Sequence, residues 1–219
     1  MPTHGPADRR RAGAPVTVDA VVFDLGNVLV RWDPYLPFVG RMDRAEVEAM
    51  FDEIDFPTIN HGLDAGRPWS EARAEVLRRY PQRADAFDLY RAHFAEAIPG
   101  PVDGSEPLVR DLVRIGIRVL GLTNWSAETF HHAEPAAPAI GLLEDVLVSG
   151  EVGIAKPDPR IFRLLASRYE LDPARTVFTD DSAPNVAAAA AEGFDAVLFT
   201  DPDELRTDLV RRGLPIPAA

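Results

Sequence analysis

Four charged side chains stand out because each follows an apolar run at a point where a buried strand would end. They are Asp24, the pair Asp180–Asp181 and Lys156. A carboxylate at the tip of a buried strand is costly unless it has a task. Three carboxylates brought together without partners repel one another, and their pKa values rise. A hard divalent cation such as magnesium removes that repulsion and shares its oxygen ligands with a substrate phosphate, so the pattern predicts metal-assisted chemistry on a phosphate group.

Each of these residues also has an ordinary structural explanation when it is taken alone. Asp24 can cap a turn, and Asp180–Asp181 can begin a helix together with Ser182. Lys156 can be a solvated loop lysine, and Thr123–Asn124, at the end of another apolar run, can turn the chain. Only the combination of these segments favours a functional site.

From residue 100 onward, strand and helix patterns alternate, as they do in a parallel sheet that helices cover. The predicted strands cover residues 18–23, 117–122, 146–148, 176–179 and 196–199. The predicted helices cover residues 106–115, 126–133, 159–165 and 182–192, with a last helix from 202. Ser105 is the predicted N-cap of the first of these helices. We therefore expect an α/β fold with a doubly wound parallel-sheet, Rossmann-like core.

Residues 33–100 break this alternation. Their apolar residues recur at helical spacing without a convincing strand, which predicts an all-helical cap inserted directly after the first strand. Ligands of doubly wound sheets bind beyond the carboxyl ends of the strands, so the cap would lie over the site as a lid. We expect a flexible tail at 1–16, a core of 17–32 and 101–219, and the cap at 33–100.

The composition argues against several classes of protein. The chain has 219 residues, of which 46% are apolar, enough for one core with an inserted module. Its net charge of −12 argues against a nucleic-acid partner, because phosphate backbones are bound by clustered Lys and Arg. No apolar run reaches the roughly 20 residues of a membrane span, and the absence of cysteine fits a reducing compartment. We expect a cytoplasmic monomer or homodimer that acts on a small molecule.

In this order along the chain, four segments resemble the signature motifs of the haloacid dehalogenase superfamily. They are Phe23–Leu29, Leu122–Asn124, Ala155–Pro159 and Phe178–Ser182. The predicted cap is similar to the one that many members insert between the first two motifs. The first and fourth motifs look most like those of small sugar-phosphate phosphatases related to glucose-1-phosphatase.

The resemblance implies a reaction on a small phosphate ester with Mg2+ as cofactor. Asp24 would attack phosphorus and form an aspartyl-phosphate that water then hydrolyses. Magnesium would be held by Asp24, the Gly26 carbonyl and Asp181, with Asp180 as a direct or water-mediated ligand.

The resemblance also implies which residues bind the phosphate group. Thr123 and the Asn124 amide would donate hydrogen bonds to phosphoryl oxygens, and Lys156 would pair with both the phosphate and Asp24. The expected substrate-side residues further include Gly26, Asn27, Trp32 and His61.

One position departs from the pattern. Many phosphatases of this superfamily carry a second aspartate two residues after the nucleophile, where it protonates the leaving group and then activates water, but this chain has Gly26 there. A missing general acid or base typically costs about 10²–10⁴-fold in rate. The candidates to replace it are the substrate itself, a water molecule or a cap residue such as His61, within the cap segment 61–66.

Three functions are compatible with these residues. Magnesium-dependent hydrolysis of a phosphate ester, with a sugar phosphate favoured, comes first. A metal-free 2-haloacid dehalogenase, in which Asp24 attacks carbon and expels halide, comes second because Asp180–Asp181 would repel its carboxylate substrate. A catalytically idle protein that binds a phosphorylated ligand comes third, with Gly26 marking the loss of turnover.

Overall fold

The computed structural model describes residues 17–217, so the tail predicted at 1–16 lies outside the described residues. The strands are β1 (Ala20–Phe23), β2 (Arg118–Thr123), β3 (Val146–Val148), β4 (Thr176–Asp180) and β5 (Asp195–Leu198). The helices are α1 (Arg44–Ile54), α2 (Phe56–Asp64), α3 (Trp69–Arg79), α4 (Ala84–Ala92), α5 (Ser105–Arg114), α6 (Ala133–Ala136), α7 (Ser149–Val152), α8 (Pro159–Arg168), α9 (Ala183–Ala191) and α10 (Pro202–Arg211). Among the described residues, none of these helices is long and apolar enough to cross a membrane.

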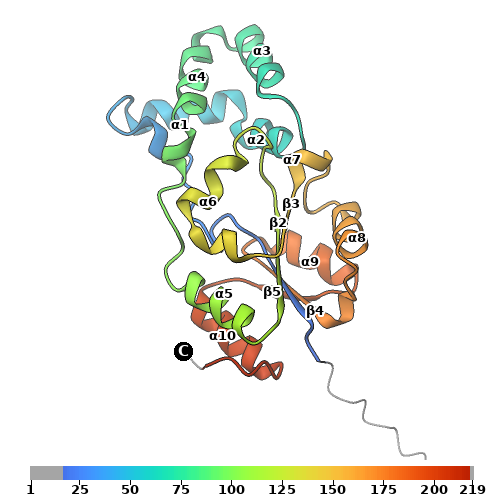
Figure 1. The fold of residues 1–219 in the computed structure, drawn as a ribbon. Coiled ribbons are helices and arrows are strands. Elements are labelled where there is room, and N and C mark those ends of the chain that lie inside the picture. Colours follow the sequence, from blue (N-terminus) through green and yellow to red (C-terminus); the bar gives the residue numbers. More distant parts are fainter. Residues whose placement is uncertain (1–16, 218–219) are drawn as a thin grey trace, which may run out of the picture.

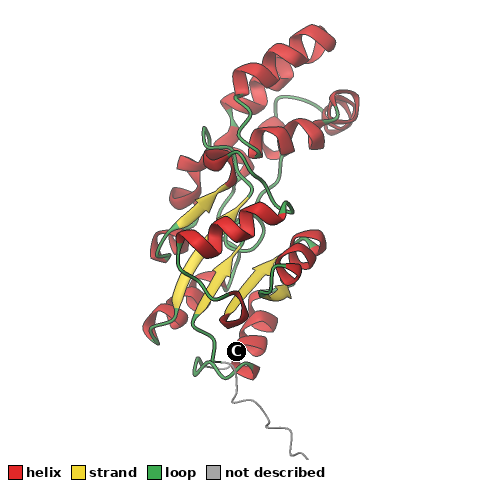
Figure 2. Ribbon diagram, turned by 90° about the vertical axis from the view of Figure 1, so that its right-hand side faces the viewer, coloured by secondary structure: helices red, strands yellow, loops and turns green. Residues whose placement is uncertain are grey.

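The five strands form one parallel sheet in the order β3-β2-β1-β4-β5, so the first strand of the chain lies in the middle. Phe23, the last residue of β1, is in register with Gly121 of β2 and Thr179 of β4. The carboxyl ends of these strands therefore meet at one edge of the sheet, and Figure 2 shows that edge facing the helices at the far end of the molecule. The α/β fold class predicted from the sequence is confirmed.

Helices cover both faces of the sheet. Successive side chains of a strand point to opposite faces, and in β1 Val21 and Phe23 pack with residues of α5 and α10. Ala20 and Val22 pack on the other face with residues of α8 and α9 (Figure 1). Because both faces are buried, the strand is apolar throughout, and polar side chains appear only where it ends.

Residues 33–100 contain only helices and turns, and α1–α4 gather beyond the carboxyl edge of the sheet (Figure 1). Their interior is aromatic, with Phe51 stacked on Phe56 at 4.0 Å between ring centroids. The chain enters and leaves this group side by side, through an antiparallel bridge between Val30 and Pro101. We keep residues 33–100 as the proposed cap and the rest as the proposed core.

The cap also touches the core beside the carboxyl edge, in a contact of Gly66 and Trp69 with Ser126 and Gly150 that we call the cap–core seam. The Trp69 indole N–H donates to the Ser126 hydroxyl at 3.2 Å. Gly66 has a φ of +91°, and a Cβ added there would lie 3.1 Å from the Gly150 carbonyl oxygen. Since side chains larger than hydrogen disfavour both conditions, glycine lets the two backbones approach here.

Two local predictions are wrong. The helix expected at 126–133 is a turn followed by a short 3-10 helix, Phe130–His132, that leads into α6. The Thr129 hydroxyl donates to the Ser126 carbonyl at 3.4 Å, a side-chain bond to the backbone that favours a turn. Ser105 is the first residue of α5 rather than its N-cap, because its hydroxyl donates to the Val28 carbonyl at 2.6 Å. That bond ties α5 to the turn after β1.

Candidate active site

Asp24 is the first residue after β1, at the centre of the carboxyl edge. Its backbone amide donates to the Thr179 carbonyl of β4 at 2.8 Å, which extends the strand pairing by one residue. Its Oδ1 oxygen accepts from the Leu25 amide at 2.7 Å and lies 2.8 Å from Lys156 Nζ. Within residues 17–217 no hydrogen bond reaches the other oxygen, Oδ2. Asp24 thus has one oxygen held by the protein and one left for chemistry.

Lys156 lies beneath this carboxylate and is 1% exposed. Besides its contact with Asp24, its ammonium group donates to Asp180 Oδ2 at 2.6 Å and to the Leu122 carbonyl at 2.8 Å. An ammonium group has three donors, so none remains for a phosphoryl oxygen. The pairing with Asp24 is present as predicted, whereas the direct contact of Lys156 with phosphate stays a prediction. Lys156 is also the only lysine of the 219-residue chain.

Asn124 holds the backbone of Lys156 in place. Its side-chain NH₂ donates to the Lys156 carbonyl and its side-chain oxygen accepts from the Lys156 amide, both at 2.8 Å. The backbone amide of Asn124 is therefore the group left for the phosphate contact that we predicted. Thr123, the last residue of β2, is buried and does not line the cavity described below. The second motif thus serves first to position the lysine of the third.

The three acids differ in their surroundings. Asp180 is fully buried, and Lys156 and Asn185 donate to its oxygens. Asp181 is exposed and lines the cavity. Carboxylate oxygens of Asp24, Asp180 and Asp181 lie within 4.8 Å of one another, a donor set that fits a hard divalent cation. When all are ionised, three carboxylates and one ammonium leave two negative charges for a cation to balance.

Loss of hydration and charge repulsion raise the pKa values of Asp24 and Asp181. For Asp24 the loss of hydration is the largest effect; Lys156 lowers its pKa, Asp180 raises it, and the result is about 7. The pKa of Asp181 is raised by partial loss of hydration and then by the charge of Asp180. Burial opposes the charge on Lys156, but Asp24 and Asp180 outweigh it and raise the pKa of that ammonium group. The repulsion expected from the sequence is therefore present.

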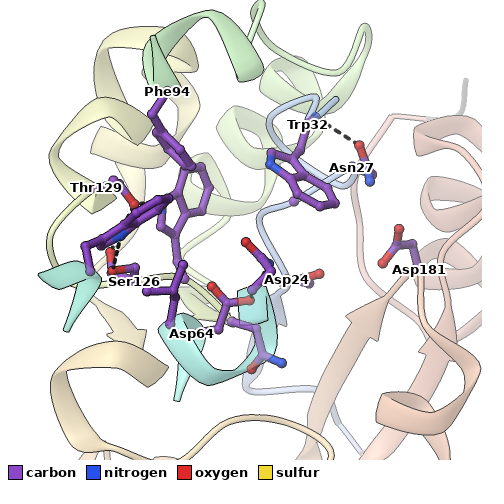
Figure 3. A pocket seen from close by; sticks show the side chains of 14 residues that line it. Asp24, Asn27, Trp32, Asp64, Phe94, Ser126, Thr129 and Asp181 are labelled. Atoms are coloured by element: carbon purple, nitrogen blue, oxygen red, sulfur yellow. Dashed lines mark hydrogen bonds between the residues drawn. The ribbon is translucent and has the colours of Figure 1, made fainter. Parts of the chain in front are cut away.

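A cavity of about 230 Å³ opens at Asp24, between the core and the cap (Figure 3). Its wall contains all three tryptophans of the chain, Trp32, Trp69 and Trp125, together with Phe94. Trp32 lies in the segment that leads into the cap, which we call the neck of the cap. Trp69 and Phe94 lie in the cap itself, and Trp125 lies in the loop after β2. The cavity therefore has an aromatic part of its wall above a charged base.

Two hydroxyl groups of this wall already bond indole N–H groups. The hydroxyl groups of Ser126 and Thr129 accept hydrogen bonds from the indole N–H groups of Trp69 and Trp125. In the described part of the chain, no lysine, arginine or histidine lines the cavity. A bound molecule would therefore place its charged end at the carboxyl edge of the sheet and its body against aromatic rings.

Of the three acids that line the cavity in residues 17–217, Asp64 alone comes from the cap. It is the last residue of α2, and its side chain points toward Asp24 (Figure 3). Asn60, one turn earlier, donates to Asp64 Oδ2 at 3.0 Å. Burial, followed by the charge of Asp24, raises the pKa of Asp64 to about 7. Sequence reasoning missed this residue, although it named the segment 61–66 that contains it.

His61, the cap residue expected near the site, does not line this cavity. It is exposed and borders a separate hollow, which shares Trp32, Asn60 and Asp64 with the cavity. Because α2 continues to Asp64, the segment 61–66 begins as a helix, and His61 faces outward. The available signal was the spacing of Asn60 and Asp64, since residues four apart share one face of a helix.

The turn after β1 brings Gly26, Asn27 and Trp32 to the cavity wall, where they were predicted. Asn27 has a φ of +56°, a left-handed conformation in which Asn is enriched. Its side-chain oxygen accepts from the Trp32 amide at 3.0 Å and so fixes the neck of the cap (Figure 3). A Cβ built on Gly26 meets nothing within 4 Å. That these three residues bind substrate stays a prediction.

Comparisons with known proteins agree on one family. A family model described as haloacid dehalogenase-like hydrolase matches residues 18–193. The chain is 27% identical over 191 residues to a sesquiterpene phosphatase of Aspergillus oryzae, covering 84% of this chain and 91% of that protein. It is also 27% identical over 204 residues to a phosphatase of Mycobacterium tuberculosis, covering 90% of this chain and 94% of that protein.

The fold has a close counterpart among solved structures. A HAD-family enzyme from Bacteroides thetaiotaomicron, crystallised with magnesium and inorganic phosphate, superposes with a TM-score of 0.65 at 21% identity. The match covers 84% of this chain and 95% of that one, and it concerns the fold.

Proposed function

The chain belongs to the haloacid dehalogenase-like hydrolases, because the family model spans most of its length, and on this premise we propose that it is a magnesium-dependent phosphomonoesterase. Membership confirms the superfamily resemblance, whereas the closer likeness to glucose-1-phosphatase stays a prediction. Both curated relatives described above are named as phosphatases. The observation that carries the proposal is the free Asp24 oxygen beside the carboxylates of Asp180 and Asp181, with Lys156 beneath.

In the proposed reaction, Asp24 Oδ2 attacks phosphorus, and a new P–O bond forms while the bond to the leaving group breaks. Lys156 keeps the carboxylate oriented through its contact with Oδ1 and offsets part of its charge. Water then hydrolyses the aspartyl-phosphate and releases inorganic phosphate. Asp24, Asp181 and the Gly26 carbonyl would hold magnesium, with Asp180 behind them. When bound, the cation would neutralise charge between the carboxylates and the phosphate.

The cavity wall bears on the leaving group. A sugar phosphate, favoured by the sequence, needs free hydrogen-bond partners for its hydroxyl groups. The hydroxyl oxygens of Ser126 and Thr129 already accept from indole N–H groups, and four of the lining residues are aromatic. We therefore propose a leaving group with an apolar or aromatic body, a chemistry that also fits the name of the sesquiterpene phosphatase relative. A sugar phosphate becomes the second candidate.

Phosphate release tests both parts of the proposal. The substrates are p-nitrophenyl phosphate, farnesyl phosphate and glucose 1-phosphate, each with magnesium or with chelator. We expect turnover only with magnesium, and a higher kcat/KM for the first two esters than for the sugar phosphate. A preference for glucose 1-phosphate would contradict the apolar leaving group while leaving the phosphatase activity intact.

The same assays separate the two alternative functions. Halide release from 2-chloropropionate without magnesium would identify a dehalogenase. Binding of magnesium and inorganic phosphate by calorimetry, without release of phosphate from any ester, would identify an idle binding protein.

A further inference from the structure

The proposed hydrolysis needs a group that handles protons, and position 26 lacks one. The leaving-group oxygen must gain a proton, and the attacking water must lose one. Of the described acids that line the cavity, Asp24 is the proposed nucleophile and Asp181 belongs to the proposed metal site. Asp64 is the acid that has no other task.

We propose that Asp64 is the general acid and base of this reaction, supplied by the cap in place of the side chain missing at Gly26. The inference rests on the proposed function. Asp24 reaches the cavity from the end of β1, whereas Asp64 reaches it from the end of α2, and the two side chains point toward one another (Figure 3). A phosphate ester attacked by Asp24 would therefore carry its leaving-group oxygen on the side from which Asp64 approaches.

Contacts on both sides hold Asp64 in this position. Asn60 donates to its carboxylate from within α2. The Ser149 hydroxyl of α7 donates to the Asp64 backbone carbonyl, which ties the end of α2 to the core. The cap–core seam begins two residues later, at Gly66. Asp64 is thus a cap residue whose placement relative to the core is fixed at the cavity, as a proton-transfer group requires.

The electrostatic setting is consistent with this role. A general acid must hold a proton near the working pH. Loss of hydration is the largest cause that raises the pKa of Asp64, and it does not depend on a neighbouring charge.

The proton balance closes over the two steps. When the P–O bond to the leaving group breaks, its electron pair stays on the leaving oxygen, which takes the proton of Asp64. In the second step the Asp64 carboxylate takes a proton from water while the water oxygen bonds to phosphorus. The P–O bond to Asp24 then breaks, its electron pair returns to Asp24, and Asp64 is again protonated.

A matched pair of esters with good and poor leaving groups tests the first step. We would compare p-nitrophenyl phosphate with 2-phenylethyl phosphate, whose alkoxide needs a proton to depart, for the unmodified chain and for Asp64→Asn. The control is Asp55→Asn at the other end of α2, an exposed residue in a left-handed conformation that Asn also accepts. Thermal melting checks that all variants fold.

We expect Asp64→Asn to lose about 10²–10⁴-fold in kcat/KM for the phenylethyl ester and less than about tenfold for the nitrophenyl ester. The ratio kcat/KM reports only the steps up to alcohol release, so it is not lowered by the loss of the base, which acts in the second step. Slow hydrolysis of the aspartyl-phosphate should instead appear as a burst of one nitrophenolate per chain, followed by slow turnover. Asp55→Asn should leave both esters unchanged.

Rescue from the core side distinguishes proton transfer from a structural role. Because a side chain at position 26 has open space, Gly26→Asp combined with Asp64→Asn should restore turnover of the phenylethyl ester at least tenfold over Asp64→Asn alone. An equal loss for both esters, without a burst and without rescue, would overturn the role of Asp64 while leaving the phosphatase proposal standing. No phosphate release by the unmodified chain would overturn the proposed function and this inference together.

Discussion

The two sides of the cavity differ in the kind of side chain that they present. The core side is charged, and its groups stand at the ends of parallel strands, where Lys156 joins Asp24 to Asp180 through contacts of 2.8 and 2.6 Å. The cap side is aromatic and contributes one carboxyl, Asp64, from the end of a helix. The core side suits the phosphate group that all such substrates share, whereas the cap side suits the part that differs. Chemistry and selectivity are therefore encoded in separate stretches of this chain.

The largest effect should come from the core side, with Asp24→Asn. The amide cannot attack phosphorus, so we expect turnover of p-nitrophenyl phosphate to fall on the order of 10⁴-fold or more. Stability should not fall with it, because the substitution removes a buried acid whose pKa is already raised to about 7. Phosphate release and thermal melting measure the two quantities. Retained activity would mean that Asp24 is not the nucleophile, and it would contradict the conclusion that the core side carries the chemistry.

The next largest effect should come from Lys156→Met. It leaves Asp24 and Asp180 buried without their shared cation, and breaking a buried pair typically costs about 3–5 kcal/mol in the free energy of unfolding. Urea denaturation without magnesium measures this loss. Adding Asp180→Asn should recover much of it, since replacing both partners of a buried pair is far less costly than removing one. A negligible loss in the single variant would mean that the core side is not held together by its lysine.

The pH dependence of stability should be dominated by the two facing acids, one from each side. Asp24 and Asp64 have a pKa of about 7 when folded, against 3.8 as the ordinary value. Between about pH 4 and 7 the folded state therefore holds protons that the unfolded state has lost. The free energy of unfolding should fall as pH rises, by up to about 1.4 kcal/mol per pH unit for each acid, and level off above pH 7.

Magnesium should change the pH dependence of stability only through Asp24, the acid of the core side. The cation favours the ionised form of Asp24, so added magnesium should raise the melting temperature more at pH 7.5 than at pH 5. Denaturation with magnesium and with chelator across this range measures the difference. In Asp64→Asn the magnesium effect should persist; if it disappeared, the metal site would extend into the cap.

The smallest effect should come from the aromatic wall. Trp32→Leu should lower the ratio of kcat/KM for farnesyl phosphate over methyl phosphate by about two- to tenfold, because aromatic contacts contribute about 0.5–1.5 kcal/mol each. Leu77→Ala, at an exposed position of α3 outside the cavity wall, should leave the ratio unchanged. An unchanged ratio in Trp32→Leu would remove this part of the wall from substrate selection.

The core side could be predicted from sequence because a parallel sheet forces the outcome. Strands that are apolar throughout and end in Asp24 or Asp180 must bring those residues to one edge, whichever helices cover the sheet. The charge repulsion at that edge follows from the same placement. What the motifs did not reveal is that the three donors of Lys156 are fully engaged, because two of the acceptors depend on the exact arrangement of neighbouring strand ends.

The cap side could be predicted only as helical. Helical spacing indicates which residues of α2 are apolar, but the face that meets the core depends on how the cap docks. His61 was therefore as plausible as Asp64 until the cap–core seam fixed the rotation of the helix. The helix expected at 126–133 is instead a turn and a short 3-10 helix, where the Thr129 hydroxyl bonds the Ser126 backbone carbonyl.

The single lysine of this chain is buried, so in the folded protein its side chain should not react with amine-modifying reagents. Lys156 is 1% exposed and its nitrogen is enclosed by three acceptors, while every other basic side chain apart from histidine is an arginine, which acylating reagents leave untouched. Acylation of a lysine side chain therefore requires the cluster to open. The rate at which one acyl mass increment appears at Lys156 would therefore measure how often the cluster opens in the native protein.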